Sequence, residues 1–298
     1  MIQDIAPHKL NNQYDVNAKP SSCSYAMHFK NSEILANVSK TGTDFLKAGE
    51  CENKVSKAGE CENKVPGGES FTFLFRIDQD DYYLINDDAY RAVYGKEFQP
   101  PEGFEYHNLR KLRFEGNLRP EQAFAAYTAR HLSDWYRDTK FCGRCGAVME
   151  HSKIERAMVC PECRYTAYPR IMPAVIVGVK NGDSLLLTRY KNDLGYNALV
   201  AGFTEIGETL EETVAREVME ETGIRVKNIR YYKSQPWGIA NDLLTGFYCE
   251  ADGDTKIRVD ENELSRAIWT KREDIELQPG TYSLTNEMMT RFKDGKEK

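Results

Sequence analysis

Three glutamates in the second half of the sequence have the residue type and spacing of a metal site. Glu217, Glu220 and Glu221 stand at i, i+3 and i+4, so on a helix their carboxylates share one face. Like charges at this spacing repel by about 0.2–0.5 kcal/mol. A divalent cation would reverse that sign, and oxygen ligands favour Mg²⁺ or Mn²⁺. The three glutamates taken alone fit either such a site or a solvated acidic helix face.

Four cysteines predict a second metal site with a different role. They form two CxxC pairs separated by fourteen residues, close to the spacing of a structural zinc site with four thiolate ligands. Such a site leaves no coordination position for chemistry. A redox dithiol and packing cysteines are the alternatives. The segment that holds these cysteines would form a zinc ribbon. Acidic residues lie beside its basic ones, which weakens the interpretation that it binds nucleic acid. The predicted ligands are Cys142, Cys145, Cys160 and Cys163.

A well-bounded helix must position the three glutamates. Thr209 followed by Glu212 is a capping box, and Gly223 suits the left-handed residue that ends a helix. These signals predict a helix over residues 210–222. Runs rich in β-forming residues surround it: MPAVIVGV, SLLLTRY, LVAGF, IRYYKSQPW and LTGFYCEA. Residues 169–298 therefore predict a mixed α/β domain.

The first half of the chain predicts a separate α+β domain over residues 1–138, with the ribbon at 139–168. FTFLFRI and YYLI flank the polar turn DQDD and predict a hairpin. A helix beginning at Pro120 leads into the first CxxC. KAGECENKV at 47–55 recurs at 57–65, which predicts a surface loop with a tandem duplication. Metal binding by Cys51 and Cys61 is the alternative there.

Composition narrows the function classes. The chain has 298 residues, 40 Lys and Arg against 46 Asp and Glu, and a net charge of −6, which argues against a protein that coats a phosphate backbone. No apolar run approaches the ~20 residues that span a bilayer. The N-terminal residues carry no secretory signal. We expect a cytoplasmic protein without a membrane partner.

The glutamates belong to a longer pattern. Gly202, five residues, Glu208, seven residues, then REVMEETGI from Arg216 reproduce the Nudix box, so this sequence resembles the Nudix hydrolase family. The resemblance implies an α/β/α sandwich with a mixed sheet whose loop–helix–loop holds Mg²⁺ or Mn²⁺ against a diphosphate. It implies that Glu217 and Glu221 are metal ligands and Glu220 a further ligand or base. Arg216 and Glu208 would be an ion-paired scaffold.

A zinc ribbon directly before a Nudix domain is similar to the NADH pyrophosphatase branch of that family. TKFCGRCG, YPR after the last cysteine, LVAGFTEIGE and SQPW are further matches. The resemblance implies hydrolysis of NADH or NAD⁺ to nicotinamide mononucleotide and AMP. Removal of NAD caps from RNA is a further activity that it implies, and a homodimer is the usual state of the branch.

The branch also implies individual site residues. The Ala201 carbonyl, Glu217, Glu221 and Glu263 would bind the catalytic metal, with Glu261 the nearest competitor for the last role. Packing is the alternative for Tyr168 and Trp237, and a solvated loop acid is the alternative for Glu263. The implied substrate-binding residues are Glu155, Tyr168, Gln235, Pro236, Trp237, Gly238, Ile239, Ala240, Asn241, Asp242 and Ser283.

One segment departs from the branch pattern. SQPW normally continues as PFPxS, whereas this chain continues with GIAND at 238–242. The loss of one aromatic ring and two prolines bears on nicotinamide recognition and leaves the metal chemistry untouched. Two rival functions therefore stay open. One is a Nudix diphosphatase of an ADP-sugar or dinucleoside polyphosphate, and the other is a ribbon-based nucleic-acid-binding regulator with a ligand-sensing Nudix unit.

Overall fold

The computed structural model describes residues 1–297 except 32, 52–64, 66, 116–117 and 192–194. The chain divides into two compact units. The C-terminal unit comprises Met1–Gln3 and Ile171–Lys298, and the N-terminal unit comprises Asp4–Arg170. In the described part of the chain, every helix is too short or too polar to cross a bilayer. Most of the predicted duplication loop lies outside the described residues.

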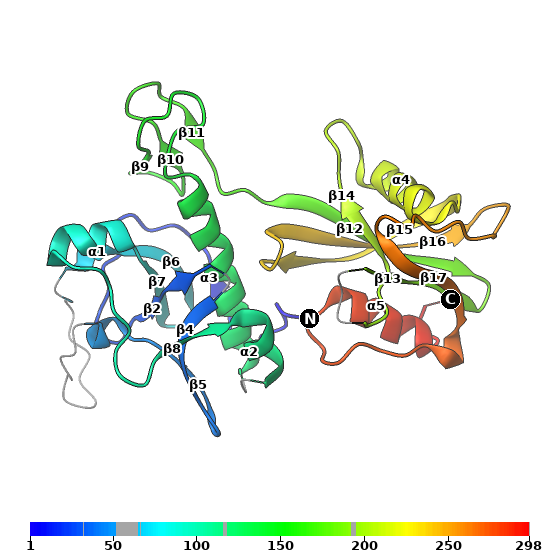
Figure 1. The fold of residues 1–298 in the computed structure, drawn as a ribbon, viewed down its shortest axis with the longest axis horizontal. Coiled ribbons are helices and arrows are strands. Elements are labelled where there is room, and N and C mark those ends of the chain that lie inside the picture. The colour runs from blue at the N-terminus through cyan, green and yellow to red at the C-terminus, as the bar shows by residue number, and fades with distance from the viewer. Residues whose placement is uncertain (32, 52–64, 66, 116–117, 192–194, 298) are drawn as a thin grey trace. The chain divides into compact units, whose positions relative to one another are not determined.

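A six-stranded mixed sheet forms the centre of the C-terminal unit (Figure 1). The strand order is β15-β16-β12-β13-β17, and β14 pairs with β12. β12 runs parallel to β16, and the other pairings are antiparallel. The strands are β12 (Met172–Asn181), β13 (Ser184–Tyr190), β14 (Val200–Phe203), β15 (Val226–Trp237), β16 (Asp242–Ala251) and β17 (Leu264–Lys271).

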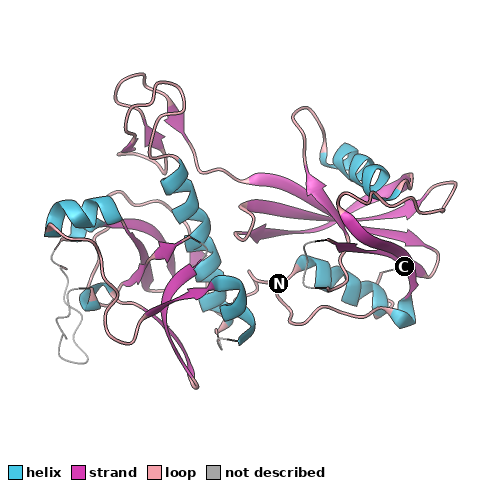
Figure 2. Cartoon of the chain, in the orientation of Figure 1, coloured by secondary structure: helices cyan, strands magenta, loops and turns pink. Residues whose placement is uncertain are grey.

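Two helices cover opposite faces of this sheet (Figure 2). Successive residues of β12 face opposite sides, and the two core clusters follow that alternation. Val175 and Val177 pack with Val214 and Val218 of α4 (Leu210–Thr222). Ile176 packs with α5 (Leu284–Lys293), which follows the short helix η3 (Arg272–Asp274). The predicted α/β/α sandwich with a mixed sheet is confirmed.

Before its cysteine region, the described part of the N-terminal unit contains two small sheets and three α-helices. One sheet has the order β1-β6-β7-β2, and the other has β3-β4-β5 with β8 on β4. The predicted hairpin is present as β6 and β7, and the predicted helix from Pro120 is α3. The elements are β1 (Leu10–Asn11), β2 (Tyr25–Met27), β3 (Phe29–Lys30), β4 (Glu33–Ser39), β5 (Gly42–Phe45), η1 (Ala48–Glu50), η2 (Gly68–Ser70), β6 (Phe71–Ile77), β7 (Asp80–Ile85), α1 (Asp87–Tyr94), β8 (Glu105–Asn108), α2 (Leu109–Glu115) and α3 (Pro120–Asp138).

The cysteine region ends this unit. α3 leads directly into a three-stranded antiparallel sheet of order β11-β10-β9. Its strands are β9 (Glu150–His151), β10 (Met158–Val159) and β11 (Thr166–Ala167). These two-residue strands bury little apolar surface, so a ribbon of this size depends on a metal or on neighbouring packing for its stability.

Candidate active site and cysteine site

α4 begins and ends where its capping signals predict. Thr209 Oγ1 accepts the backbone N–H of Glu212 at 3.2 Å, and the Glu212 carboxylate accepts the N–H of Thr209 at 2.8 Å. Gly223 ends the helix with φ of 69° and donates its N–H to the Met219 carbonyl. Both ends are fixed, so the carboxylates between them have defined positions on the helix.

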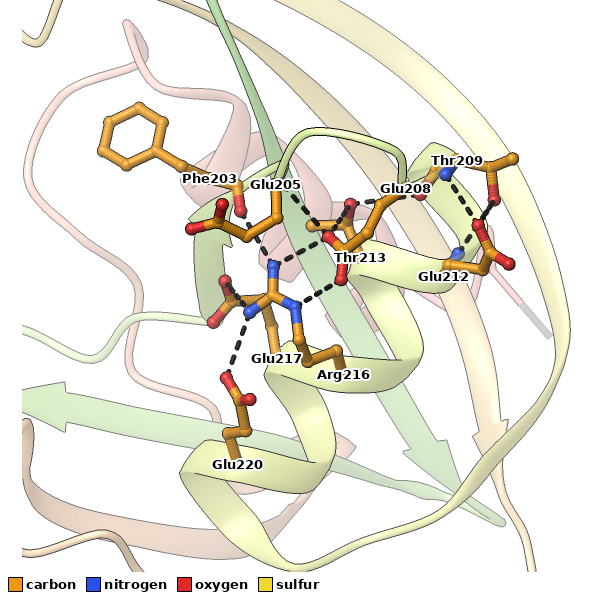
Figure 3. Close-up of polar contacts among 9 residues, drawn as sticks. All are labelled: Phe203, Glu205, Glu208, Thr209, Glu212, Thr213, Arg216, Glu217 and Glu220. Atoms are coloured by element: carbon orange, nitrogen blue, oxygen red, sulfur yellow. Dashed lines mark hydrogen bonds and ion pairs between the residues drawn. The ribbon is translucent and has the colours of Figure 1, made fainter.

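Arg216 is the centre of a charge network that joins the helix to the loop before it (Figure 3). Its Nε and Nη2 bind the two oxygens of Glu208 at 2.6 and 2.9 Å, a bidentate pairing. Its Nη1 binds Glu217 at 2.8 Å and Glu220 at 3.0 Å. Nη2 also reaches the Phe203 carbonyl at the end of β14. The guanidinium of Arg216 lowers the pKa of Glu208 to about 2, so this carboxylate is ionised.

Glu221 is the buried member of the carboxylate group, with 2% of its surface exposed. Its Oε1 accepts the Tyr190 hydroxyl at 3.0 Å. Its Oε2 is buried and has no hydrogen-bond partner among the described residues. Burial raises the pKa of Glu221 to about 8, and the nearby Glu217 and Glu263 charges act in the same direction. A buried, unpartnered carboxylate oxygen is the feature that a cation would satisfy.

Glu217 and Glu263 lie close enough to Glu221 for their charges to act on its carboxylate. Burial raises the pKa of Glu217, and the Glu220 and Glu263 charges act in the same direction. Any Cβ at Gly202 would overlap the Glu217 carboxylate, so only glycine lets this side chain pack against β14. The Ala201 carbonyl lies 3.3 Å from the Tyr190 hydroxyl, next to Glu221. An oxygen-only donor set with excess negative charge fits Mg²⁺ or Mn²⁺.

The carboxylates of this site are less tightly clustered than the four cysteines. Within the described residues, only the four cysteines bring three or more His, Cys, Asp or Glu ligand atoms within 4.8 Å of one another. The carboxylate oxygens of Glu217, Glu221 and Glu263 therefore do not all lie within that distance of one another.

The structure adds one residue that the sequence did not indicate. Tyr190, at the end of β13, contacts both Glu221 and the Ala201 backbone through its hydroxyl. Tyrosine is found both buried and exposed in folded proteins, so the type and position of this residue give no functional signal in the sequence.

The four cysteines lie as a zinc ion requires. Cys142 and Cys163 have their Sγ atoms 3.6 Å apart, and those of Cys145 and Cys160 are 3.4 Å apart. Tetrahedral zinc with Zn–S bonds of ~2.3 Å needs sulfurs ~3.7 Å apart. The N–H groups of Arg144 and Cys163 point at the sulfurs of Cys142 and Cys160. These bonds stabilise thiolates, so the site fits one structural Zn²⁺.

Two predicted substrate residues lie in the N-terminal unit. Tyr168 donates its hydroxyl to Glu155 Oε1 at 3.1 Å, and 59% of the tyrosine surface is exposed. This exposure favours a binding surface over core packing for Tyr168.

The other predicted substrate residues lie around the turn that joins β15 and β16. Gln235 is fully buried; its side chain binds the Tyr282 carbonyl and the Leu284 N–H, each at 2.7 Å. Ser283 is the N-cap of α5, and its hydroxyl also donates to Gln278. Among the described residues, the side chains of residues 236 and 238–241 have no hydrogen-bond partner, whereas Trp237 does make interactions. The turn itself closes with the Ala240 N–H on the Trp237 carbonyl at 3.2 Å.

Asp242 is a buried acid at the start of β16. It is 5% exposed, and its Oδ1 has no hydrogen-bond partner among the described residues. Burial raises its pKa from 3.8 to about 7. Between these pH values the folded chain holds a proton that the unfolded chain has lost, so this group makes stability fall as pH rises.

We expect Asp242→Asn to raise the thermal unfolding temperature more at about pH 8.5 than at about pH 5.5, because asparagine removes the buried charge. Circular dichroism melts at both pH values measure the difference. Asp254→Asn, at an acid that is 67% exposed, is the matched control and should show no such pH dependence. Equal gains for Asp242→Asn at both pH values would show that the buried carboxyl does not titrate as expected.

Comparisons with known proteins match the regions of the chain that contain the two sites. Residues 170–292 match the NUDIX domain model, and residues 137–168 match the NADH pyrophosphatase zinc ribbon domain model. A protein of Klebsiella pneumoniae named NAD-capped RNA hydrolase NudC is 50% identical over 177 residues, which are 58% of this chain and 67% of that protein. A protein of the same name from Shigella flexneri is 50% identical over 50% of this chain and 58% of its own length.

Among solved structures, a NUDIX hydrolase from Nitrosomonas europaea aligns with 52% of this chain and 90% of its own, with 22% identity and a TM-score of 0.46. The chain thus spans between about half and two thirds of the curated relatives that it matches.

Proposed function

Because the chain belongs to the Nudix hydrolase family, we propose that it hydrolyses the pyrophosphate bond of NADH and NAD⁺ to nicotinamide mononucleotide and AMP. The observation that carries this proposal is the buried Glu221. Its Oε2 has no hydrogen-bond partner among the described residues, and the charges of Glu217 and Glu263 act on it. The ribbon and the relatives named NAD-capped RNA hydrolase support the dinucleotide class of substrate.

Each group of the site has a role in this reaction. The Ala201 carbonyl, Glu217, Glu221 and Glu263 would hold Mg²⁺ or Mn²⁺. When bound, these cations neutralise the pyrophosphate and activate a water for in-line attack on phosphorus. Arg216 and Glu208 fix the helix face so that the ligands do not relax away from one another. Glu220 is more exposed, and Arg216 contacts its Oε2. Its other carboxylate oxygen would serve as a further metal ligand or as the base.

The zinc has no part in the chemistry, because four thiolates fill its coordination shell. We propose that it holds the ribbon so that Tyr168 and Glu155 are presented for substrate binding. Residues 236–242 are proposed separately as substrate-binding residues of the C-terminal unit. The hydroxyl of Ser283 is engaged in capping α5, so its contribution would be to fix the helix beside that turn.

We also propose the wider setting of the enzyme. NAD-capped RNA is a second substrate, as the names of the relatives suggest, and release of an NAD cap from a 5′-NAD transcript tests this. We propose three domains, at residues 1–138, 139–168 and 169–298. We also propose that the enzyme works as a homodimer, and sedimentation would measure its oligomeric state. Its location is cytoplasmic, where a four-thiolate site stays reduced.

The experiment that tests substrate choice is a kinetic comparison of NADH, NAD⁺ and ADP-ribose with Mg²⁺ or Mn²⁺. Turnover of ADP-ribose with little turnover of NADH would favour the rival diphosphatase of ADP-sugars. Absence of turnover with every diphosphate would favour the regulator, because a sensor binds without hydrolysis.

The altered turn gives a sharper prediction. Gly238→Pro with Ile239→Phe restores a ring and a rigid backbone, and the extended Trp237 accepts a following proline. Ala240 is kept, because its N–H closes the turn. We expect the double variant to lower KM for NADH by several-fold with little change in kcat. Val38→Phe, which adds a ring at an exposed position on β4 outside the predicted site, is the control and should leave KM unchanged. An unmoved KM would show that this turn does not set specificity.

A further inference from the structure

An irregularity in the pairing of β13 with β17 lies at Tyr190 and affects the direction of its side chain. β13 and β17 pair in register up to Arg189 and Arg266, but Tyr190 then pairs with Leu264, which leaves Ser265 as an extra residue. Ser265 Oγ donates to the Arg189 carbonyl at 3.0 Å and secures the irregularity. Bulges of this kind redirect a side chain and are common beside active sites.

The redirected hydroxyl joins two other elements. It accepts the Ala201 N–H of β14 at 3.0 Å, and it lies 3.0 Å from Glu221 Oε1 on α4. The Ala201 carbonyl is 3.3 Å away. A hydroxyl has one proton, so it donates to Glu221 or to the carbonyl, and the carboxylate is the stronger and nearer acceptor.

The two oxygens of the Glu221 carboxylate therefore have different surroundings. Tyr190 occupies Oε1, and Oε2 is the oxygen without a hydrogen-bond partner among the described residues. The tyrosine ring packs against the core cluster that includes Val214 and Val218 of α4. The hydroxyl is thus held by the same core that holds the helix.

We propose that Tyr190 is a positioning residue of the catalytic metal site, which holds the Glu221 carboxylate and the Ala201 backbone in the geometry that a divalent cation needs. The inference rests on the proposed function for the identity of the ion. Tyr190 would act only through these two ligands, which are the groups that its hydroxyl contacts. Partners of this kind change metal affinity by about 10- to 100-fold in other proteins.

The test is Mn²⁺ binding to the zinc-loaded enzyme without substrate. The electron paramagnetic resonance signal of free Mn²⁺ measures how much of the ion is bound. We expect Tyr190→Phe to weaken Mn²⁺ binding about 10-fold and to leave the unfolding temperature of the metal-free enzyme within a few degrees. At saturating Mn²⁺, kcat should return to near its original value. Tyr231→Phe, at a tyrosine with 53% exposure on β15, is the matched control and should change neither quantity.

Two results would overturn the proposal. Unchanged Mn²⁺ affinity in Tyr190→Phe would show that the hydroxyl does not position the ligands. Loss of affinity together with a collapse of the unfolding temperature would show a structural role only. Because binding is measured without substrate, failure to hydrolyse NADH would count against the proposed function and not against this inference.

Discussion

Glu221→Gln should lower turnover by ~10² or more, the scale on which catalytic charges act, while the chain stays folded. Glutamine is nearly isosteric and can still accept the Tyr190 hydroxyl through its Oε1. It lacks the charge that a divalent cation requires. Steady-state kinetics with NADH at saturating Mg²⁺ measures the loss.

The stability of this variant should move the opposite way. The pKa of Glu221 is raised from 4.5 to about 8 by burial, so the ionised carboxylate destabilises the metal-free fold as pH rises through this window. Removing the charge should leave the unfolding temperature of the metal-free enzyme unchanged or higher, most clearly near the upper end of the window. Loss of activity with retained stability separates a ligand role from a folding role.

Glu211→Gln is the matched control, because Glu211 lies exposed in the first turn of the same helix. It should retain full turnover. Near-normal kcat for Glu221→Gln at saturating metal would remove Glu221 from the set of metal ligands.

Cys142→Ser should lose zinc and thermal stability together. Four thiolates contribute binding free energy directly to the folding of so small a sheet, and serine is a poor zinc ligand. We expect the zinc content to fall from one ion per chain toward zero and the ribbon to unfold. Elemental analysis and thermal melts on one sample measure both quantities.

Cys249→Ser separates zinc loss from ordinary destabilisation. Cys249 is buried in the C-terminal unit and belongs to its core cluster, so serine there should lower the melting temperature by burying a hydroxyl. Its zinc content should stay unchanged. A Cys142→Ser variant that keeps its zinc would contradict the four-thiolate site.

The parts of the site that could be predicted are those fixed by local rules. The bounds of α4 follow from the Thr209–Glu212 box and Gly223, because caps act between neighbours in sequence. The placement of Glu217, Glu220 and Glu221 on one face of α4 follows from the helical period of 3.6 residues. CxxC pairs likewise act locally, since each knuckle is a short turn.

The parts that were not predicted depend on distant contacts. α5 has ten residues, and a helix of that length is marginal alone, so it forms because Leu284, Met288 and Phe292 pack under the sheet. The second N-terminal sheet was missed because β4 is buried at three successive positions and does not alternate. Tyr190 becomes recognisable only when β13, β14 and α4 meet in space.

The Gln235 side chain links the hairpin β15–β16 to the start of α5 through two hydrogen bonds. The Leu284 amide bonds to a side chain of the hairpin and not to a carbonyl of its own helix. Its hydrogen can exchange with solvent only when the two segments separate, so the exchange rate of this one amide measures how often they part. A dinucleotide that binds at the turn after Trp237 should slow that exchange, even though Leu284 itself is fully buried.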